Sequence, residues 1–327
     1  MGCEIREMSF AEVLDTGFRL PRNPRRGAAL TVSASMPELS VVMPAYNAGP
    51  YLRESIDSVL AEVEDDAEVV VVDDGSTDET PRILAGYGDR IRVVAGEHAG
   101  LSAARNRCLE HATGHWVAFH DADDVVAPGR FASLRRVLAA HPDAHGVFGN
   151  GARLDDASVS VVPAPLARAC AGRRLTARDL FDGYPVYFQA AVIAREAFRA
   201  AGPFDVGLPV QPDIEYGYRL FTRFTILFVD EVVFRYRVHD TNMSSNRLGT
   251  REDIVRILER LAAENGSAAE TIGRARLEDR LARHYYRIAR TRLARGEREA
   301  ARAMARKATA LRPLNPRYQL LYRWQTR

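Results

Sequence analysis

The sequence predicts an α/β fold, a Rossmann-like, mostly parallel sheet sandwiched by helices. Two observations predict it: short, almost purely apolar runs of strand length recur along the chain, and amphipathic helical segments separate them. Parallel strands have this composition because helices bury both faces of the sheet. The expected strands are residues 39–43, 69–72, 91–94 and 116–119, and the expected helices are residues 51–61, 80–84, 102–112 and 130–140.

Three regions are expected along the 327 residues. Residues 1–36 form an N-terminal extension or linker, which includes a Pro- and Arg-rich stretch. Residues 37–245 form the main α/β domain, and residues 246–327 form a helical C-terminal extension. Within that extension, helices at 276–295 and 298–311 flank Gly296 and Glu297 as a helical hairpin.

Composition excludes several classes of protein. The three cysteines are widely spaced, which fits a reducing cytosol and gives no zinc or disulfide signature. The sequence shows neither a secretory start nor an apolar run long enough to cross a bilayer, so a cytoplasmic protein is expected. Glycine-rich dinucleotide and P-loop motifs are absent, and no basic strip interleaved with aromatic residues indicates nucleic-acid binding.

The net charge of +2 hides an asymmetry between the two ends of the chain. From Arg251 onward there are about 19 basic and about 9 acidic residues. Such a basic end could lie against an anionic membrane, as a peripheral contact on its inner face, or against an acidic partner. The alternative, which the composition favours, is a set of Arg-rich helices with one solvated face.

Acidic residues crowd the end of the expected strand at 116–119. His120, Asp121, Ala122, Asp123 and Asp124 follow it directly. Carboxylates at the end of a buried strand repel one another unless a positive group neutralises them. A divalent cation that also binds substrate phosphates is one such group. The alternative is a solvated acidic turn before the next helix.

Three unusual loops are expected to meet at one edge of the sheet. Ligands of open α/β sheets bind outside the carboxyl ends of the strands. The loops at residues 44–47, 73–78 and 121–123 all follow strands and therefore converge there. Asp74 could accept hydrogen bonds from a nucleobase, while Ser76, Thr77 and Asp78 also suit the start of a helix.

Three further candidates remain open when judged from spacing alone. Arg105 lies near a helix start and suits either an anionic ligand or a structural ion pair. Asp213 could act as a general base, but Asp213 and Glu215 also suit the first turn of a helix that contains Arg219. His239 gains a role as a metal ligand or phosphate contact only if the fold brings it to Asp123.

Four segments together resemble family 2 glycosyltransferases of the GT-A fold, over about residues 39–239. They are Val41–Asn47 (VVMPAYN), Val71–Asp78 (VVDDGSTD), Ala103–Asn106 (AARN) and Asp121–Asp124 (DADD). The resemblance implies a nucleotide-diphosphate sugar donor, a Mg²⁺ or Mn²⁺ ion and inversion at the anomeric carbon. Residues 37–150 would then be the nucleotide-binding half and residues 151–245 the acceptor half.

The resemblance also implies roles for individual residues. Asp213 would be the catalytic base, with Glu215 as the alternate because Pro212 replaces the glutamate of the family's Glu-Asp motif. Asp123, of the D-x-D motif, would hold the metal, and His239, in Tyr-Arg-Val-His, would approach the metal or diphosphate. The residues implied to bind the nucleotide sugar are Pro44, Ala45, Tyr46, Asn47, Asp74, Gly75, Ser76, Arg105, Asp121 and Ala122.

The expected activity is an inverting, metal-dependent, hexosyltransferase-type reaction in polysaccharide or glycoconjugate synthesis, on a saccharide or lipid-linked acceptor. The Gln-x-x-Arg-Trp motif of processive members is absent, which favours single additions. A nucleotidyltransferase is an alternative, although it would carry a Gly-rich basic loop where this chain has Pro-Ala-Tyr-Asn. A non-catalytic nucleotide-binding scaffold is another, suggested only by Pro212. The sequence specifies neither the base, sugar, acceptor and linkage nor the oligomeric state.

Overall fold

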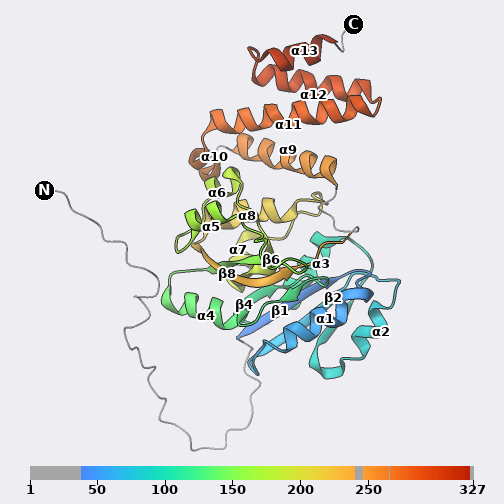
Figure 1. Ribbon diagram of the computed structural model, residues 1–327, viewed down its shortest axis with the longest axis vertical. Helices are drawn as coiled ribbons and strands as arrows, with labels where there is room; N and C mark the ends of the chain where they lie inside the picture. The colour runs from blue at the N-terminus through green and yellow to red at the C-terminus, as the bar shows by residue number, and fades with distance from the viewer. Residues whose placement is uncertain (1–37, 240–245, 265, 325–327) are drawn as a thin grey trace, which may run out of the picture. The chain divides into compact units, whose positions relative to one another are not determined.

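The computed structural model describes residues 38–239, 246–264 and 266–324. All of them belong to one compact unit, Met36–Arg327, and the predicted extension at 1–36 lies outside the described residues. An eight-stranded sheet with the order β3-β2-β1-β4-β7-β6-β8-β5 forms its centre (Figure 1). The strands are β1 (Leu39–Ala45), β2 (Ala67–Asp73), β3 (Arg92–Ala95), β4 (Trp116–Phe119), β5 (Val125–Val126), β6 (Gly146–Arg153), β7 (Ala191–Ala194) and β8 (Ile226–Tyr236).

The first four strands form the predicted parallel half of the sheet. β1 lies between β2 and β4 and is parallel to both, and β2 is parallel to β3. Because the strand order reverses between β1 and β4, the crossover helices cover opposite faces of the sheet. Figure 1 shows α1 (Gly49–Leu60), α2 (Thr80–Ala85) and α4 (Arg130–Ala140) on one face, and α3 (Leu101–His111) on the other. A short 3₁₀ turn, η2 (Gly88–Arg90), precedes β3.

Four strands form the second half of the sheet, and three of them, β5, β6 and β7, were not predicted, whereas the start of β8 coincides with a strand-like apolar run at residues 226–229. β7 runs antiparallel to β4 and β6, and β5 runs antiparallel to β8. β6 lacks an apolar run because it contains three glycines. Side chains of β8 fill the space above two of them: a Cβ on Gly149 would lie 2.6 Å from Val233, and one on Gly151 would lie 2.3 Å from Phe234.

Short helices follow the sheet strands in this half of the chain. They are α5 (Ala164–Cys170), α6 (Ala177–Asp182), η3 (Phe188–Ala190), α7 (Arg195–Ala201) and α8 (Pro212–Arg223). A capping box begins α6, where the Thr176 hydroxyl accepts from the backbone N–H of Asp179 and the Asp179 carboxylate accepts from that of Thr176. Pro212 occupies the first turn of α8, where its missing N–H is not needed.

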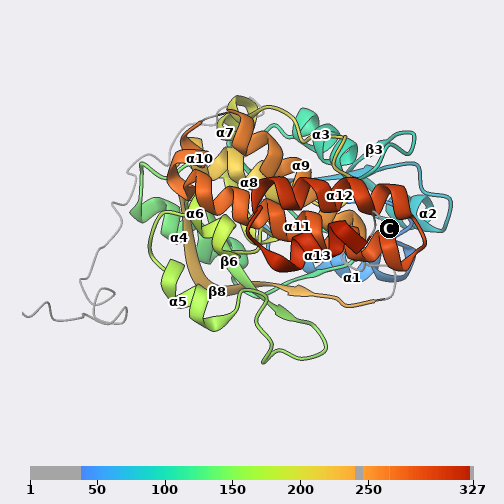
Figure 2. The ribbon, with the colours of Figure 1, turned by 90° about the horizontal axis from the view of Figure 1, so that it is seen from above.

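The C-terminal region is helical, as predicted. It contains α9 (Arg247–Glu264), α10 (Ser267–Ile272), α11 (Arg274–Ala294), α12 (Arg298–Leu311) and α13 (Pro316–Trp324), seen from above in Figure 2. The predicted hairpin is α11 and α12, joined at Gly296, whose φ of 79° suits glycine. Leu277 and Leu281 of α11 are buried, and Arg276 forms an ion pair with Asp182 of α6. Within the described residues, no helix is both long enough and apolar enough to cross a membrane.

Helix α9 holds the loop that leads into α8. The buried carboxylate of Asp253 accepts hydrogen bonds from the backbone N–H groups of Val210 (2.8 Å) and Gln211 (3.0 Å). Nearby, Arg256 donates to the carbonyl of Gly207. Through these contacts α9, a helix outside the sheet domain, fixes the start of α8. Asp213 lies at that start.

Candidate active site

Hydrogen bonds connect the loops at residues 44–47 and 73–78, which confirms that these two loops converge as predicted. The backbone N–H of Asn47 donates to the Ser76 hydroxyl at 2.9 Å, and the Asn47 side-chain oxygen accepts from the N–H of Thr77 at 2.8 Å. Asn47 has a φ of +48°, which Asn tolerates better than most residues. The N–H of Asp74 also donates to the carbonyl of Ala45.

Tyr46 and Asp74 lie together beneath the loop that follows β3. The Asp74 carboxylate is buried and accepts from the backbone N–H groups of Ala99 and Gly100. Tyr46 is 46% exposed, and the imidazole of His98 stacks on its ring at a centroid distance of 3.9 Å. Gly75 allows the loops to pack closely, since a Cβ there would lie 2.6 Å from the backbone nitrogen of His98. The predicted nucleoside residues are therefore gathered in one place.

A buried guanidinium joins the third loop to α8. Arg105 of α3 forms an ion pair with Asp213 and lies 3.5 Å from the carboxylate of Asp121. Burial raises the pKa of Asp121 to about 6; Arg105 opposes this shift, and repulsion from Asp123 and Asp213 adds to it. Of the two roles that spacing allows for Arg105, the structure shows the ion pair. It brings Asp213 to the acidic strand end.

A second buried arginine lies under the same strand end. Arg130 of α4 donates to the carbonyl of Phe119 at 2.8 Å and to Nδ1 of His120 at 3.3 Å. Burial lowers the pKa of Arg130 to about 9, and burial together with Arg130 lowers the pKa of His120 to about 3, so the imidazole is neutral. Asp124 is also buried, accepts from Gln189, and has a pKa raised well above its ordinary value by that burial. The acidic cluster thus has both a cation and hydrogen-bond donors beneath it.

The end of β8 brings His239 to Asp123. Nε2 of His239 lies 2.9 Å from Oδ2 of Asp123, and the imidazole stacks on Tyr51 of α1 at a centroid distance of 4.9 Å. Arg237 donates to the backbone carbonyl of Asp123 at 2.8 Å, which holds the two segments together. The fold therefore brings His239 to Asp123, as a role for His239 at the site requires.

The pair Asp123 and His239 fits a divalent cation that is shared with a phosphate ligand. A carboxylate oxygen and an imidazole nitrogen are suitable donors for Mn²⁺ and, with more oxygen ligands, for Mg²⁺. Within the described residues, no group of three or more His, Cys, Asp or Glu side chains could hold a metal unaided. Phosphate oxygens and water would have to complete the coordination.

The structure separates the two carboxylates of α8. Glu215 forms an ion pair with Arg219 at 2.6 Å, and Arg219 also donates to the carbonyls of Ala201 and Pro203. Asp213 instead faces Arg105 and, through it, Asp121. Glu215 therefore has the helix-start and i+4 partnership that spacing favoured, whereas Asp213 belongs to the cluster.

The chain is similar to known glycosyltransferases. A sequence model described as Glycosyl transferase family 2 matches residues 40–198. The match covers just under half of the chain and includes all four segments that resemble the family. An uncharacterised glycosyltransferase of Rickettsia prowazekii is 29% identical over 224 residues, which are 67% of this chain and 70% of the relative. The Escherichia coli glycosyltransferase YibD is 40% identical over 100 residues, 30% of this chain and 29% of that protein.

Solved structures show that the chain has the expected GT-A fold. S. aureus TarS 1–349 in complex with UDP-GlcNAc matches with a TM-score of 0.65 at 18% identity, covering 88% of this chain and 89% of that one. The mannosyltransferase PcManGT from Pyrobaculum calidifontis, with GDP-Man and Mn²⁺, gives 0.57 at 23%, covering 90% and 85%. Glucosyl-3-phosphoglycerate synthase from Mycobacterium tuberculosis, with Mn²⁺, UDP and product, gives 0.52 at 25%, covering 69% and 80%.

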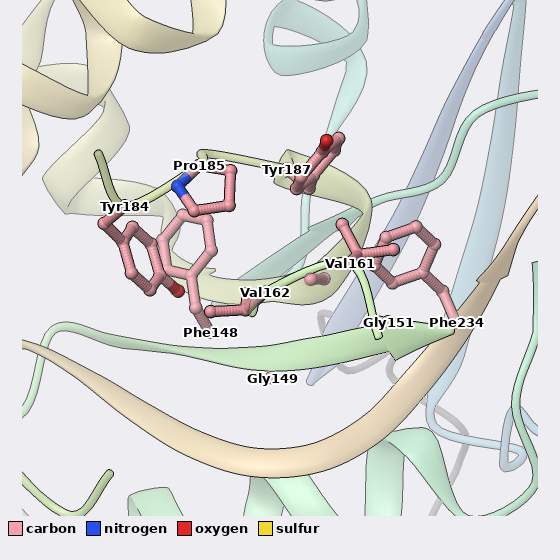
Figure 3. Close-up of a pocket in the computed structure, with 10 residues that line it drawn as sticks. Phe148, Gly149, Gly151, Val161, Val162, Tyr184, Pro185, Tyr187 and Phe234 are labelled. Carbon is pink, nitrogen blue, oxygen red and sulfur yellow. The ribbon is translucent and has the colours of Figure 1, made fainter. Parts of the chain in front are cut away.

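An apolar gap lies beside this glycosyltransferase site but does not form part of it. Figure 3 shows Tyr187 at one end of the gap and Phe234 beside it. The gap has no room for a water molecule, and most of its lining is apolar: Phe148, Gly149, Gly151, Val161, Val162, Tyr184, Pro185, Tyr187, Ala190 and Phe234. It is an imperfection in the packing of β6 against its neighbours and offers no place for a charged donor.

Four contributors to the site of this glycosyltransferase were missed by the sequence analysis. His98 and Gln189 come from irregular segments, and nothing in their neighbouring residues distinguishes them. Arg130 is buried in a helix start, where an arginine is expected to be solvated. Arg237 lies within the Tyr-Arg-Val-His segment and could have been found there, because it sits two residues before His239.

Arg105→Met is expected to destabilise the protein by about 3 kcal/mol, because it leaves the mostly buried Asp121 and Asp213 without their cation. Chemical denaturation monitored by circular dichroism would measure the loss. Arg135→Met is the matched control: its partners Glu64 and Asp66 are largely exposed, so a loss of at most about 1 kcal/mol is expected. Equal losses for the two variants would contradict a central role for the Arg105 pair.

Proposed function

We propose that this glycosyltransferase moves a sugar from a nucleotide-diphosphate sugar to an acceptor hydroxyl with inversion, one sugar at a time and with a divalent cation. Two contacts beyond the carboxyl ends of the parallel strands carry the proposal. Asp123 lies against His239. Arg105 connects Asp121 to Asp213. The match to the family model adds support, as do the UDP-GlcNAc, GDP-Man and Mn²⁺ named for the structural relatives.

The donor would lie along the edge formed by β1, β2 and β4. Tyr46 offers an exposed aromatic face for the base, and the Asp74 carboxylate lies beside it. The nucleoside pocket would be shaped by other residues of these loops: Pro44, Ala45, Asn47, Gly75 and Ser76. The ribose would lie near Asp121 and Ala122. Arg105 anchors the cluster from beneath, near the nucleotide. A Mg²⁺ or Mn²⁺ ion held by Asp123 and His239 would offset negative charge on the leaving diphosphate.

Asp213 would take the proton of the acceptor hydroxyl. A carboxylate can act as a general base when it lies within hydrogen-bond reach of that proton. The ion pair with Arg105 holds the Asp213 side chain in place. Attack from the face opposite the leaving group inverts the anomeric centre. The acceptor would be a saccharide or a lipid-linked glycan, in polysaccharide or glycoconjugate synthesis.

Asp123→Ala and His239→Ala should each weaken metal-dependent binding of a nucleotide diphosphate by at least about 100-fold. That factor exceeds the loss seen when residues that merely support a metal ligand are changed. Calorimetric titration of UDP and GDP, with and without Mn²⁺, measures the effect. Asp143→Ala, an exposed change after α4, is the control and should bind like the wild type. Unchanged affinity in both site variants would remove these residues from the metal site.

Asp213→Asn should retain nucleotide binding and lose sugar transfer by about 10²–10⁴-fold, the usual scale for a general base. Glu215→Gln is the matched control on the same helix and should be mild, since Glu215 is occupied by Arg219. Donor turnover with a candidate acceptor, together with nucleotide affinity as a check on folding, separates the two. If Glu215→Gln is the crippling change, the base is Glu215.

The basic C-terminal helices are proposed to contact an anionic membrane surface. Arg298, Arg302 and Arg306 recur at intervals of four on α12, are exposed, and have no ion-pair partner among the residues described. Basic residues near such a surface contribute about 1 kcal/mol each. Some other arginines of this region are held in ion pairs, as Arg276 is with Asp182.

Co-sedimentation with phosphatidylserine vesicles at low salt tests the membrane contact. Changing the three α12 arginines to glutamine should release the protein from the vesicles, because the attraction is electrostatic and additive. The control changes three exposed arginines elsewhere: Arg82, Arg168 and Arg199. A wild-type protein that ignores the vesicles would end the proposal.

A further inference from the structure

The carboxylate of Asp74 has donors of the protein around it on every side. Its oxygens lie 3.1 and 3.2 Å from the N–H of Ala99, 2.8 Å from that of Gly100, 3.3 Å from Nη1 of Arg107 and 2.9 Å from Nδ1 of His98. A carboxylate accepts about four hydrogen bonds. With these donors in place, a nucleobase N–H would have to compete for the Asp74 carboxylate.

The imidazole of His98 makes both contacts that the base would need. Its ring stacks on Tyr46, with centroids 3.9 Å apart and planes inclined by 19°. Its Nδ1 lies 2.9 Å from the Asp74 carboxylate and 3.2 Å from the backbone carbonyl of Asp74. Both groups accept, so the nitrogen is the donor. A bound nucleobase would make the same two contacts: it would stack on Tyr46 and donate an N–H to Asp74.

Only His98 among the four donors can readily leave. The N–H groups of Ala99 and Gly100 are fixed where α3 begins. Arg107 also donates to the carbonyl of Glu97 and packs against Gly96, where a Cβ would lie 2.2 Å from its Nη1.

The His98 side chain, by contrast, is half-exposed, at 51%. Its backbone is held in close contact with Gly75. Rotation about the side-chain bonds therefore removes the imidazole from the pocket while the loop stays in place.

We propose that His98 is a placeholder for the nucleobase: it covers Tyr46 and occupies Asp74 until the base of the donor nucleotide displaces it. The inference rests on the proposed function, because it takes Tyr46 and Asp74 as the base subsite. Nucleotide binding then competes with an internal ring, which lowers the affinity for nucleotides. Ligands that lack a base do not meet this competition.

Replacement of His98 separates this role from a structural one. His98→Ala should bind UDP or GDP with Mg²⁺ about tenfold more tightly than the wild type, equivalent to about 1.4 kcal/mol. The factor reflects the loss of one aromatic stack and one partly exposed ionic contact that compete with the base. Affinity for Mg²⁺-pyrophosphate should not change. His141→Ala, an exposed histidine beyond α4, is the control and should leave all affinities unaltered.

The wild-type protein provides an independent readout. In histidine-labelled protein, the ring protons of His98, assigned with the His98→Ala variant, should be shifted by the ring current of Tyr46. A saturating nucleotide with Mg²⁺ should return them to the position of an exposed histidine, whereas Mg²⁺-pyrophosphate should not.

Two results would overturn the inference on its own: a nucleotide that binds while His98 keeps its ring-current shift, or a His98→Ala variant that binds nucleotides no more tightly. If neither protein binds UDP, GDP or any other nucleoside diphosphate, the proposed function fails and the inference fails with it.

Discussion

The burial of two arginines beneath one acidic strand end is the constraint on which the site depends. Four carboxylates, Asp121, Asp123, Asp124 and Asp213, lie close enough to influence one another. Arg105 and Arg130 are buried among aromatic rings, with Arg105 between 5.6 and 5.8 Å from three phenylalanine centroids. Desolvated cations interact strongly with nearby carboxylates, so the acidic cluster can be held rigidly before any ligand arrives.

The C-terminal helices contribute to this arrangement from outside the sheet. Asp253 of α9 fixes the backbone just before α8, and Arg260 forms an ion pair with Asp205 in the same loop. Asp213 stands in the first turn of α8, so its position relative to Arg105 depends on that loop. The helical region is thus part of the structure that orients the proposed base, whatever surface its exposed arginines contact.

Most of the parallel half of the fold could be predicted from sequence, since strands such as β2 and β4 are continuous apolar runs. β6 could not, because its glycines accept side chains of β8 in place of presenting their own. The loops holding Tyr46, Asp74 and Asp121 were predicted to converge from topology alone. The role of His98 was not, because stacking on Tyr46 requires two loops from different strands to meet.

What the sequence by itself determined was the succession of the first four strands and their helices, the acidic strand end and the loops that carry polar residues, because periodicity and residue type are local properties. The tertiary structure alone decided which distant side chains meet. Arg105 and Asp213 are 108 positions apart, and Asp123 and His239 are 116 apart. It also distinguished Asp213 from Glu215, two residues away on the same helix, since α8 packs so that Asp213 meets Arg105 of α3, whereas Glu215 pairs with Arg219 one turn along α8. Spacing along the chain cannot specify that choice, because it depends on what each face of the helix packs against.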